Sequence, residues 1–161
     1  MNKVYLLIGG NIGNRREYLQ QCTKLIAITC GEIVQQSSIY ETAAWGMENQ
    51  ASFYNQILLL HTNYAAETLM QQLLLLEEKM GRKRQEKNGP RTIDIDILYY
   101  NNLQLNTVFL TVPHPRITER KFVLIPLVEI APNYIHPTLL QTNTTLLATC
   151  TDDLAVQKIS A

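Results

Sequence analysis

The first hundred residues alternate between short apolar runs, typical of strands, and two longer segments with apolar residues at helical spacing. This pattern predicts helices over 15–29 and 65–80 and strands over 3–8, 33–40, 53–61 and 93–100. An asparagine, Asn11 or Asn14, can cap the first helix, and Gly31 and Gly81 follow the two helices. The order strand, helix, two strands, helix, strand favours an α+β sandwich of ferredoxin-like type, a mainly antiparallel sheet with helices packed on it.

Shorter elements are expected after residue 100. The pattern predicts a tight turn at Asn101-Asn102, a short strand over 103–105, a rigid loop at Pro113-His114-Pro115, a helix over 120–130, a short helix over 145–150 and a last strand near Val156. No repeat, low-complexity tract or linker divides the chain. We therefore expect one domain over residues 1–161, of which 137–161 form a C-terminal extension.

Composition narrows the function classes. Hydrophobic residues make up 46% and charged residues 17% of the 161 positions, which supplies a core and excludes disorder over the whole chain. Lys and Arg together number 14, as do Asp and Glu, whereas a general polyanion binder is basic, so we expect no nucleic-acid partner. No apolar run approaches the ~20 residues that span a bilayer, and three cysteines lack paired spacing. We expect reduced thiols in a cytoplasmic protein with no membrane partner.

Asp94-Ile95-Asp96 is the most informative local feature. Successive side chains of a strand alternate between faces, so both carboxylates point to one face while Ile95 packs on the other. Two carboxylates this close repel each other unless a cation lies between them, and their oxygens suit Mg²⁺, which also takes phosphate ligands. For this motif taken alone, a solvated strand face is the alternative.

A basic segment immediately precedes the two aspartates. Six of the 14 basic residues fall within thirteen positions, namely Lys79, Arg82, Lys83, Arg84, Lys87 and Arg91. A metal site beside an arginine-rich loop suits phosphoryl transfer, because the metal bridges phosphate oxygens while arginines neutralise the charge that shifts during transfer. The two features together favour such a transfer site. A metal-dependent phosphohydrolase is the alternative on this chemistry alone, and a solvated loop is the alternative for the basic run by itself.

The histidines and a glycine-rich turn give weaker evidence for a catalytic or phosphate-binding site. The prolines around His114 fix its backbone, so its ring is placed to donate to a phosphate oxygen or to assist a leaving group, with a structural loop histidine as the alternative. His61 and His136 have no companions at metal-ligand spacing and are interpreted as structural. The segment 9–14 lacks the Lys-Ser/Thr of a phosphate-binding P-loop, so we interpret it as a strand-to-helix turn.

Several motifs occur in the order found in one enzyme family. The segment Gly89-Pro90-Arg91-Thr92-Ile93-Asp94-Ile95-Asp96-Ile97 strongly resembles the signature of the 6-hydroxymethyl-7,8-dihydropterin pyrophosphokinases of folate biosynthesis. Segments between about residues 4 and 137 are similar to other parts of that pattern: Ile8–Gly13, Ser37–Thr42, Phe53–Asn55, Glu77, Gly81–Arg84, Val112–Arg116, Arg120–Leu124 and Pro126–Pro132. So many matches in the same order argue against a chance resemblance.

The resemblance implies a reaction and its catalytic residues. The hydroxymethyl oxygen of the pterin attacks the β-phosphorus of ATP, and AMP leaves. Two Mg²⁺ ions are implied at Asp94 and Asp96, with ATP as co-substrate, and Arg82 and Arg91 would clamp the triphosphate and follow its charge into the transition state. The partners are then ATP and 6-hydroxymethyl-7,8-dihydropterin, and a monomer is expected because the family is commonly monomeric.

The resemblance also implies two sets of binding residues. Asn55 would read the amide edge of the pterin, Phe53 and Phe122 would stack on its faces, and backbone groups are offered by Thr42, Ala43, Ala44 and Trp45. Nucleotide contacts are expected at Glu77, Arg84, Ile97, Thr111, His114 and Arg120. An RNA-binding α+β module is the remaining alternative, but it needs exposed aromatics on its central strands, where this chain has the two aspartates.

Overall fold

The computed structural model describes residues 1–43, 51–81 and 92–159. The first part contains β1 (Asn2–Gly10), α1 (Arg15–Thr29), β2 (Glu32–Gln36), β3 (Ile39–Thr42), β4 (Phe53–Thr62), α2 (Ala66–Lys79) and β5 (Asp94–Tyr100). The second part contains β6 (Leu105–Asn106), β7 (Thr111–Val112), a 3₁₀ turn (Ile117–Glu119), α3 (Lys121–Ile130), α4 (Asn143–Thr149) and β8 (Val156–Ile159).

The main sheet has the strand order β5-β1-β4-β3-β8, and β2 also pairs with β4. All its pairs are antiparallel. With β2 and β3 counted as one interrupted strand, the strands and helices follow the order predicted for a ferredoxin-like sandwich. The expected fold class is therefore confirmed.

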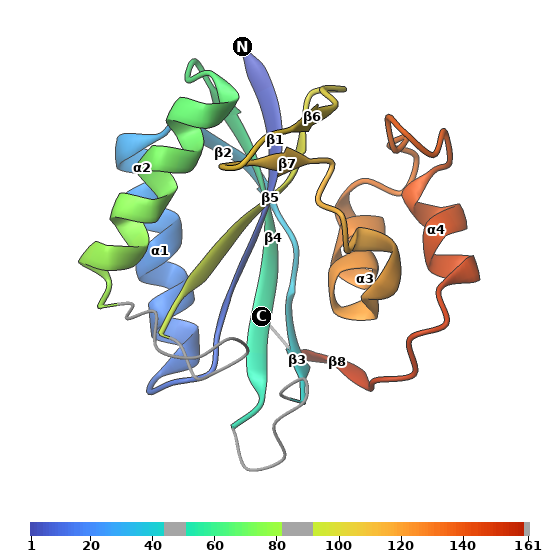
Figure 1. Cartoon of the computed structure of the whole chain (residues 1–161). Coiled ribbons are helices and arrows are strands. Elements are labelled where there is room, and N and C mark those ends of the chain that lie inside the picture. Colours follow the sequence, from blue (N-terminus) through green and yellow to red (C-terminus); the bar gives the residue numbers. More distant parts are fainter. Residues whose placement is uncertain (44–50, 82–91, 160–161) are drawn as a thin grey trace.

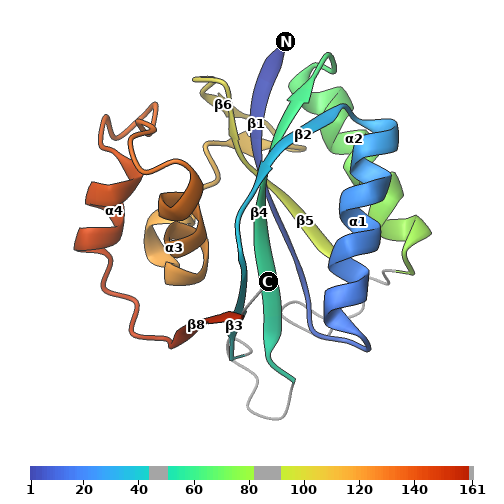
Figure 2. The ribbon, with the colours of Figure 1, turned by 180° about the vertical axis from the view of Figure 1, so that it is seen from behind.

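Both faces of the sheet are covered by helices. Figures 1 and 2 show α1 and α2 on one face and α3 and α4 on the other. Alternate residues of β1 serve the two layers: Leu6 packs in the core under α1 and α2, whereas Leu7 packs in the core under α3 and α4. A strand buried on both faces explains the continuous apolar run at the start of the chain.

The predicted single strand over 33–40 is wrong, because the structure divides it at Ser37 and Ser38 into β2 and β3. The Ser37 hydroxyl accepts the Ile57 amide at 2.9 Å, and the Gln56 side chain donates to the Ser37 carbonyl at 2.8 Å. Side-chain bonds therefore replace part of the backbone ladder here. Serine is suited to this exchange because its short hydroxyl competes with backbone partners.

Smaller differences concern caps and short strands. The first helix has the predicted bounds, and Asn14 caps it by accepting from the Glu17 amide at 3.1 Å, whereas the Asn11 side chain donates to the Ala51 carbonyl. The strand expected over 103–105 is displaced to β6, and its partner β7 went unpredicted because two residues carry no periodicity. Within the described residues, no helix combines the length and apolarity needed to cross a membrane.

Candidate active site

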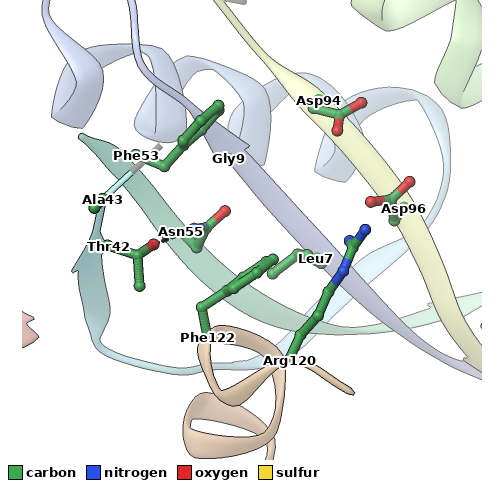
Figure 3. Close-up of a pocket in the computed structure, with 10 residues that line it drawn as sticks. All are labelled: Leu7, Gly9, Thr42, Ala43, Phe53, Asn55, Asp94, Asp96, Arg120 and Phe122. Carbon is green, nitrogen blue, oxygen red and sulfur yellow. Dashed lines mark hydrogen bonds between the residues drawn. The ribbon is translucent and has the colours of Figure 1, made fainter. Parts of the chain in front are cut away.

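One cavity opens on the sheet face that carries α3 (Figure 3). It is lined by Leu7, Gly9, Thr42, Ala43, Phe53, Asn55, Asp94, Asp96, Arg120 and Phe122. All of these except Leu7 and Gly9 were singled out from the sequence. The structure thus brings together, from three strands and the start of one helix, the residues expected at the metal, at the pterin and at one nucleotide contact.

Strand register explains how the polar groups meet. On β1, Gly9 lies opposite Asn55 of β4 on one side and opposite Asp94 of β5 on the other. Two residues earlier on β1, Leu7 lies opposite Asp96. A Cβ added at Gly9 would overlap the Oδ1 atom of Asn55, so only glycine leaves room for that amide. Sequence reasoning placed Gly9 in a strand-to-helix turn, whereas it lies in β1, and gave neither Gly9 nor Leu7 a role at the site. Their signal lies in the pairing of three strands that are distant in the chain.

The two aspartates lie side by side as the alternation predicted. Asp94 and Asp96 are half-buried and line the cavity, whereas Ile93, Ile95 and Ile97 are at most 2% exposed in the core under α1 and α2. An all-oxygen pair at the mouth of a cavity suits Mg²⁺, which keeps water and substrate phosphates as its other ligands. The residues present therefore fit a magnesium site that the substrate completes. Ile97, expected at the nucleotide, has its side chain on the core side of β5.

Glu77 of α2 holds the backbone between these aspartates. Its carboxylate, with the residue only 3% exposed, accepts the Ile95 amide at 2.6 Å. Among the described residues, β5 is an edge strand of the main sheet and not the central strand expected from the sequence. The Ile95 amide therefore points away from β1, and the glutamate takes the place of a neighbouring strand. The resemblance implied a nucleotide contact for Glu77, and the structure places its carboxylate on the backbone between Asp94 and Asp96.

The start of α3 supplies the wall opposite the aspartates. Arg120 precedes the helix, and its Cζ atom lies 5.4 Å from the centroid of the Phe122 ring. Burial and the positive charge of Arg116 lower the pKa of Arg120, while Asp96 acts in the opposite direction. Figure 3 shows the guanidinium of Arg120 pointing toward Asp96. A half-buried cation therefore faces the carboxylate pair.

Two aromatic rings flank an amide on the other side of the cavity. Figure 3 shows Asn55 between Phe53 and Phe122. Asn55 is 5% exposed, and its side-chain amide donates to the Thr42 hydroxyl at 3.4 Å. This contact with β3 orients the amide. Ring faces with one ordered amide between them suit a flat heterocycle that has hydrogen-bonding groups on its edge.

His114 lies in the loop after β7 and does not line the cavity. Its amide donates to the Leu98 carbonyl at 2.9 Å, which attaches the loop to β5, and its Nδ1 accepts the Arg116 amide at 3.1 Å. The neutral ring therefore carries its proton on Nε2. Burial, then the charges of Arg120 and Arg116, lower the pKa of His114 to about 4, with Asp94 opposing. The ring is a neutral hydrogen-bond donor at physiological pH.

The remaining predicted residues either lie away from the cavity or are not among the described residues. Thr111 of β7 donates its hydroxyl to Asn106 at 3.0 Å and does not line the cavity. Ala44, Trp45, Arg82, Arg84 and Arg91 lie outside the described residues.

Sequence reasoning also missed Arg15, the first residue of α1. Its Nη1 atom donates to the carbonyl and hydroxyl oxygens of Ser52 at 2.8 and 2.7 Å, and its Cζ lies 3.9 Å from the centroid of the Tyr54 ring. Ser52 and Tyr54 flank Phe53, so Arg15 fixes the strand on both sides of that ring. A single arginine at a helix start gives no sequence signal for such a role.

The other histidines and the cysteines take no part in the cavity. The Nδ1 of His136 accepts the Thr138 and Leu139 amides at 3.2 and 3.1 Å, which is a structural role. Cys22 and Cys30 are buried free thiols, and Cys150 is a half-buried one. In the described ranges, no group of three or more His, Cys, Asp and Glu side chains could hold a metal.

Comparisons with known proteins give the family. A family model, described as 7,8-dihydro-6-hydroxymethylpterin-pyrophosphokinase, matches residues 5–132. The 2-amino-4-hydroxy-6-hydroxymethyldihydropteridine pyrophosphokinase of Aquifex aeolicus is 42% identical over 137 residues, which cover 85% of each chain. The enzyme of that name from Bacillus subtilis is 42% identical over 133 residues, 80% of this chain and 78% of the relative.

A solved structure agrees in fold. The Plasmodium falciparum HPPK-DHPS crystal structure superposes with a TM-score of 0.71 at 19% identity, over 92% of this chain and 43% of that longer chain. This identity supports the fold alone, while the sequence relatives cover most of both chains. The chain belongs to the 7,8-dihydro-6-hydroxymethylpterin-pyrophosphokinase family, the enzymes of folate biosynthesis that transfer the pyrophosphoryl group of ATP to a hydroxymethyldihydropterin.

Proposed function

We propose that this chain performs the family reaction in the cavity of Figure 3 and that its described residues divide the work as follows. The observation that carries the assignment is one cavity in which a carboxylate pair lies beside an amide flanked by two aromatic rings. The first feature suits metal-bound phosphates, and the second suits a pterin. Their adjacency is what a transfer between the two substrates requires.

The pterin binds between Phe53 and Phe122. Stacking on both faces removes the bicycle from water, and Asn55 hydrogen-bonds its amide edge. Backbone groups near Thr42 and Ala43, at the end of β3, complete the edge contacts. A site built from such bonds rejects analogues that lack the edge groups, because its own buried polar atoms would then be unpaired.

The polyphosphate of ATP binds beside Asp94 and Asp96. These residues would hold two Mg²⁺ ions, with phosphate oxygens and water as the other ligands. When bound, the metal neutralises phosphate charge and polarises the phosphoryl oxygens. The carboxylates face the cavity, so a nucleotide held here presents its β-phosphorus toward the hydroxymethyl group of the pterin.

The cationic and neutral donors act on the phosphates. Arg120 faces the aspartates and stabilises the negative charge that moves onto the leaving AMP. His114, neutral with its proton on Nε2, donates to a phosphate oxygen without adding charge. By resemblance, Arg82, Arg84 and Arg91 bind the triphosphate as well.

Chemistry in this site needs alignment and charge stabilisation rather than a covalent enzyme intermediate. The hydroxymethyl oxygen forms a bond to the β-phosphorus, the bond from that phosphorus to the bridging oxygen of AMP breaks, and the hydroxyl proton passes to water. Glu77 acts indirectly: by holding the Ile95 amide it fixes the spacing and direction of the two carboxylates.

The test is a nucleotide assay with and without the acceptor. The protein is mixed with ATP, Mg²⁺ and 6-hydroxymethyl-7,8-dihydropterin, and the nucleotides are separated by chromatography. The proposal predicts AMP only when the pterin is present. A phosphohydrolase would give ADP or phosphate without pterin, and an RNA-binding module would give no turnover. We propose that the active species is a monomer, which size-exclusion chromatography with light scattering checks.

A further inference from the structure

The N-terminus of α3 lacks a local cap. Arg120, at the N-cap position, makes no side-chain hydrogen bond to the first turn, and that turn contains no acidic residue. The Val123 and Leu124 amides bond to the Arg120 carbonyl at 3.0 and 3.1 Å. The Lys121 amide, at the first helical position, needs a partner from elsewhere, because the first amides of a helix have none within it.

Asp152, from the C-terminal segment, supplies that partner. Its Oδ2 atom accepts the Lys121 amide at 3.0 Å, and its Oδ1 atom accepts the Leu154 amide at 3.0 Å. Both oxygens are thus engaged, so the orientation of the carboxylate is defined. A negative group at this position also complements the positive end of the α3 dipole. Asp152 lies twenty residues beyond the end of the family match.

The C-terminal segment is attached to β3 and to α3, the two elements that Asp152 lies between. On the β3 side, Val156 of β8 pairs with Thr42. Before Asp152, the helix α4 lies beside α3 (Figures 1 and 2), and its first residue, Asn143, accepts the Tyr99 hydroxyl at 2.8 Å and donates to the Ala131 carbonyl at 2.9 Å. Asp152 is therefore held between two fixed points, one on each side of it.

We infer that Asp152 is a positioning residue for the active site: by fixing the amide between Arg120 and Phe122, it holds both side chains on the cavity. Arg120 then faces the aspartates, and Phe122 forms one of the two aromatic walls. This role rests on the proposed function, since both side chains act on substrates only if the cavity is the active site. The C-terminal segment thereby becomes part of the catalytic unit.

Replacement of Asp152 is the first test, with the exposed neighbour Asp153 as the matched control. Assays run well below the midpoint of thermal unfolding, where every variant is folded. Asp152→Ala should lower kcat/KM for the pterin by about three- to tenfold, the factor that corresponds to a lost helix cap. Asp152→Asn keeps one of the two acceptor oxygens, so it should lose less kcat/KM than Asp152→Ala. Asp153→Ala should be unchanged.

A second test removes the donor instead of the acceptor. Lys121→Pro deletes the amide hydrogen, and proline is well tolerated at the first helical position. The preceding residue must then be extended, and Arg120 already is, with φ −131° and ψ 105°. Lys121→Ala controls for the lost side chain. In the Lys121→Pro background, Asp152→Ala should cause no further loss of kcat/KM, because the hydrogen bond is already absent.

Pterin affinity is measured separately by titration without ATP, because it reports Phe122 directly. The inference predicts weaker pterin binding in Asp152→Ala and no change in Asp153→Ala. Three results would overturn it: unchanged binding and kcat/KM with only a lower unfolding temperature, equal losses in the Asn and Ala variants, or additive losses with Lys121→Pro. Failure of the proposed function is distinct, since the wild type itself would then form no pterin-dependent AMP.

Discussion

Gly9→Ala tests how strand register builds the pterin site. The added methyl group would overlap the Oδ1 of Asn55 and lie 3.1 Å from the Tyr54 carbonyl oxygen. The backbone of β1 cannot retreat freely, because Gly9 pairs with strands on both sides. The Asn55 amide must therefore rotate away from the position in which it meets the pterin.

The size of the effect follows from the bonds that are lost. Misplacing Asn55 removes its edge bonds to the pterin and leaves buried polar atoms unpaired, which together cost about 2–4 kcal/mol. That free energy corresponds to roughly a 30- to 700-fold weaker pterin affinity. Overpacking should also lower the free energy of unfolding by about 1–3 kcal/mol.

Equilibrium titration with the pterin and, separately, with a magnesium-bound ATP analogue measures the two affinities. The atoms nearest to the new methyl group belong to Asn55 and Tyr54. ATP-analogue affinity should therefore fall less than pterin affinity, although Gly9 also pairs with Asp94. An Asn55→Ala background provides the control, because Gly9→Ala should there weaken pterin binding little further. Unchanged pterin affinity in Gly9→Ala, or equal losses for both ligands, would refute the reasoning.

Three further predictions address the metal ligands, their support and the anchoring of α3. Asp96→Ala should reduce turnover by several orders of magnitude while thermal unfolding shows an intact fold, since removing one of two repelling carboxylates does not destabilise the strand; near-normal turnover would contradict the metal assignment. Glu77→Ala leaves the buried Ile95 amide unpaired and should lower stability by about 1–3 kcal/mol. It should also raise the Mg²⁺ concentration needed for half-maximal activity, and an unchanged magnesium dependence would remove its positioning role. Partial burial opposes ionisation of Glu129, but hydrogen bonds from Tyr40 and Ser38 outweigh it and lower the pKa of Glu129. Ionised Glu129 therefore contributes fully to the free energy of unfolding above its unfolded pKa of about 4.3. This contribution is lost as the pH falls through the lower pKa of the folded state. The stability difference between wild type and Glu129→Gln should shrink at acid pH in denaturant titrations, and a difference that grows there would contradict the assignment.

The parts of the site that depend on local periodicity were predictable from sequence. Alternation along one strand placed Asp94 and Asp96 on one face, and the structure has both on the cavity with Ile95 buried behind them. The bounds of α1 followed from apolar spacing and an asparagine cap, whereas α4 begins two residues before the predicted start. These features depend on neighbours within a few residues, so a single sequence contains the information.

The parts that depend on distant partners were not predictable. Gly9 is needed because Asn55 lies opposite it, and the division of β2 from β3 depends on bonds between Ser37 and strand β4. Arg15 and Asp152 act on segments 37 and 31 residues away in the chain. Arginine or aspartate at such positions is also typical of an exposed surface, and only the tertiary arrangement distinguishes the two roles.

The central claim is that Asp94 and Asp96 hold the metal-bound polyphosphate beside a pterin stacked between Phe53 and Phe122. A crystal structure with Mg²⁺, a non-hydrolysable ATP analogue and the pterin tests it most directly. The account predicts magnesium on both carboxylates and the hydroxymethyl oxygen in line with the β-phosphorus. Magnesium and polyphosphate bound elsewhere, with the two aspartates free of metal, would contradict it.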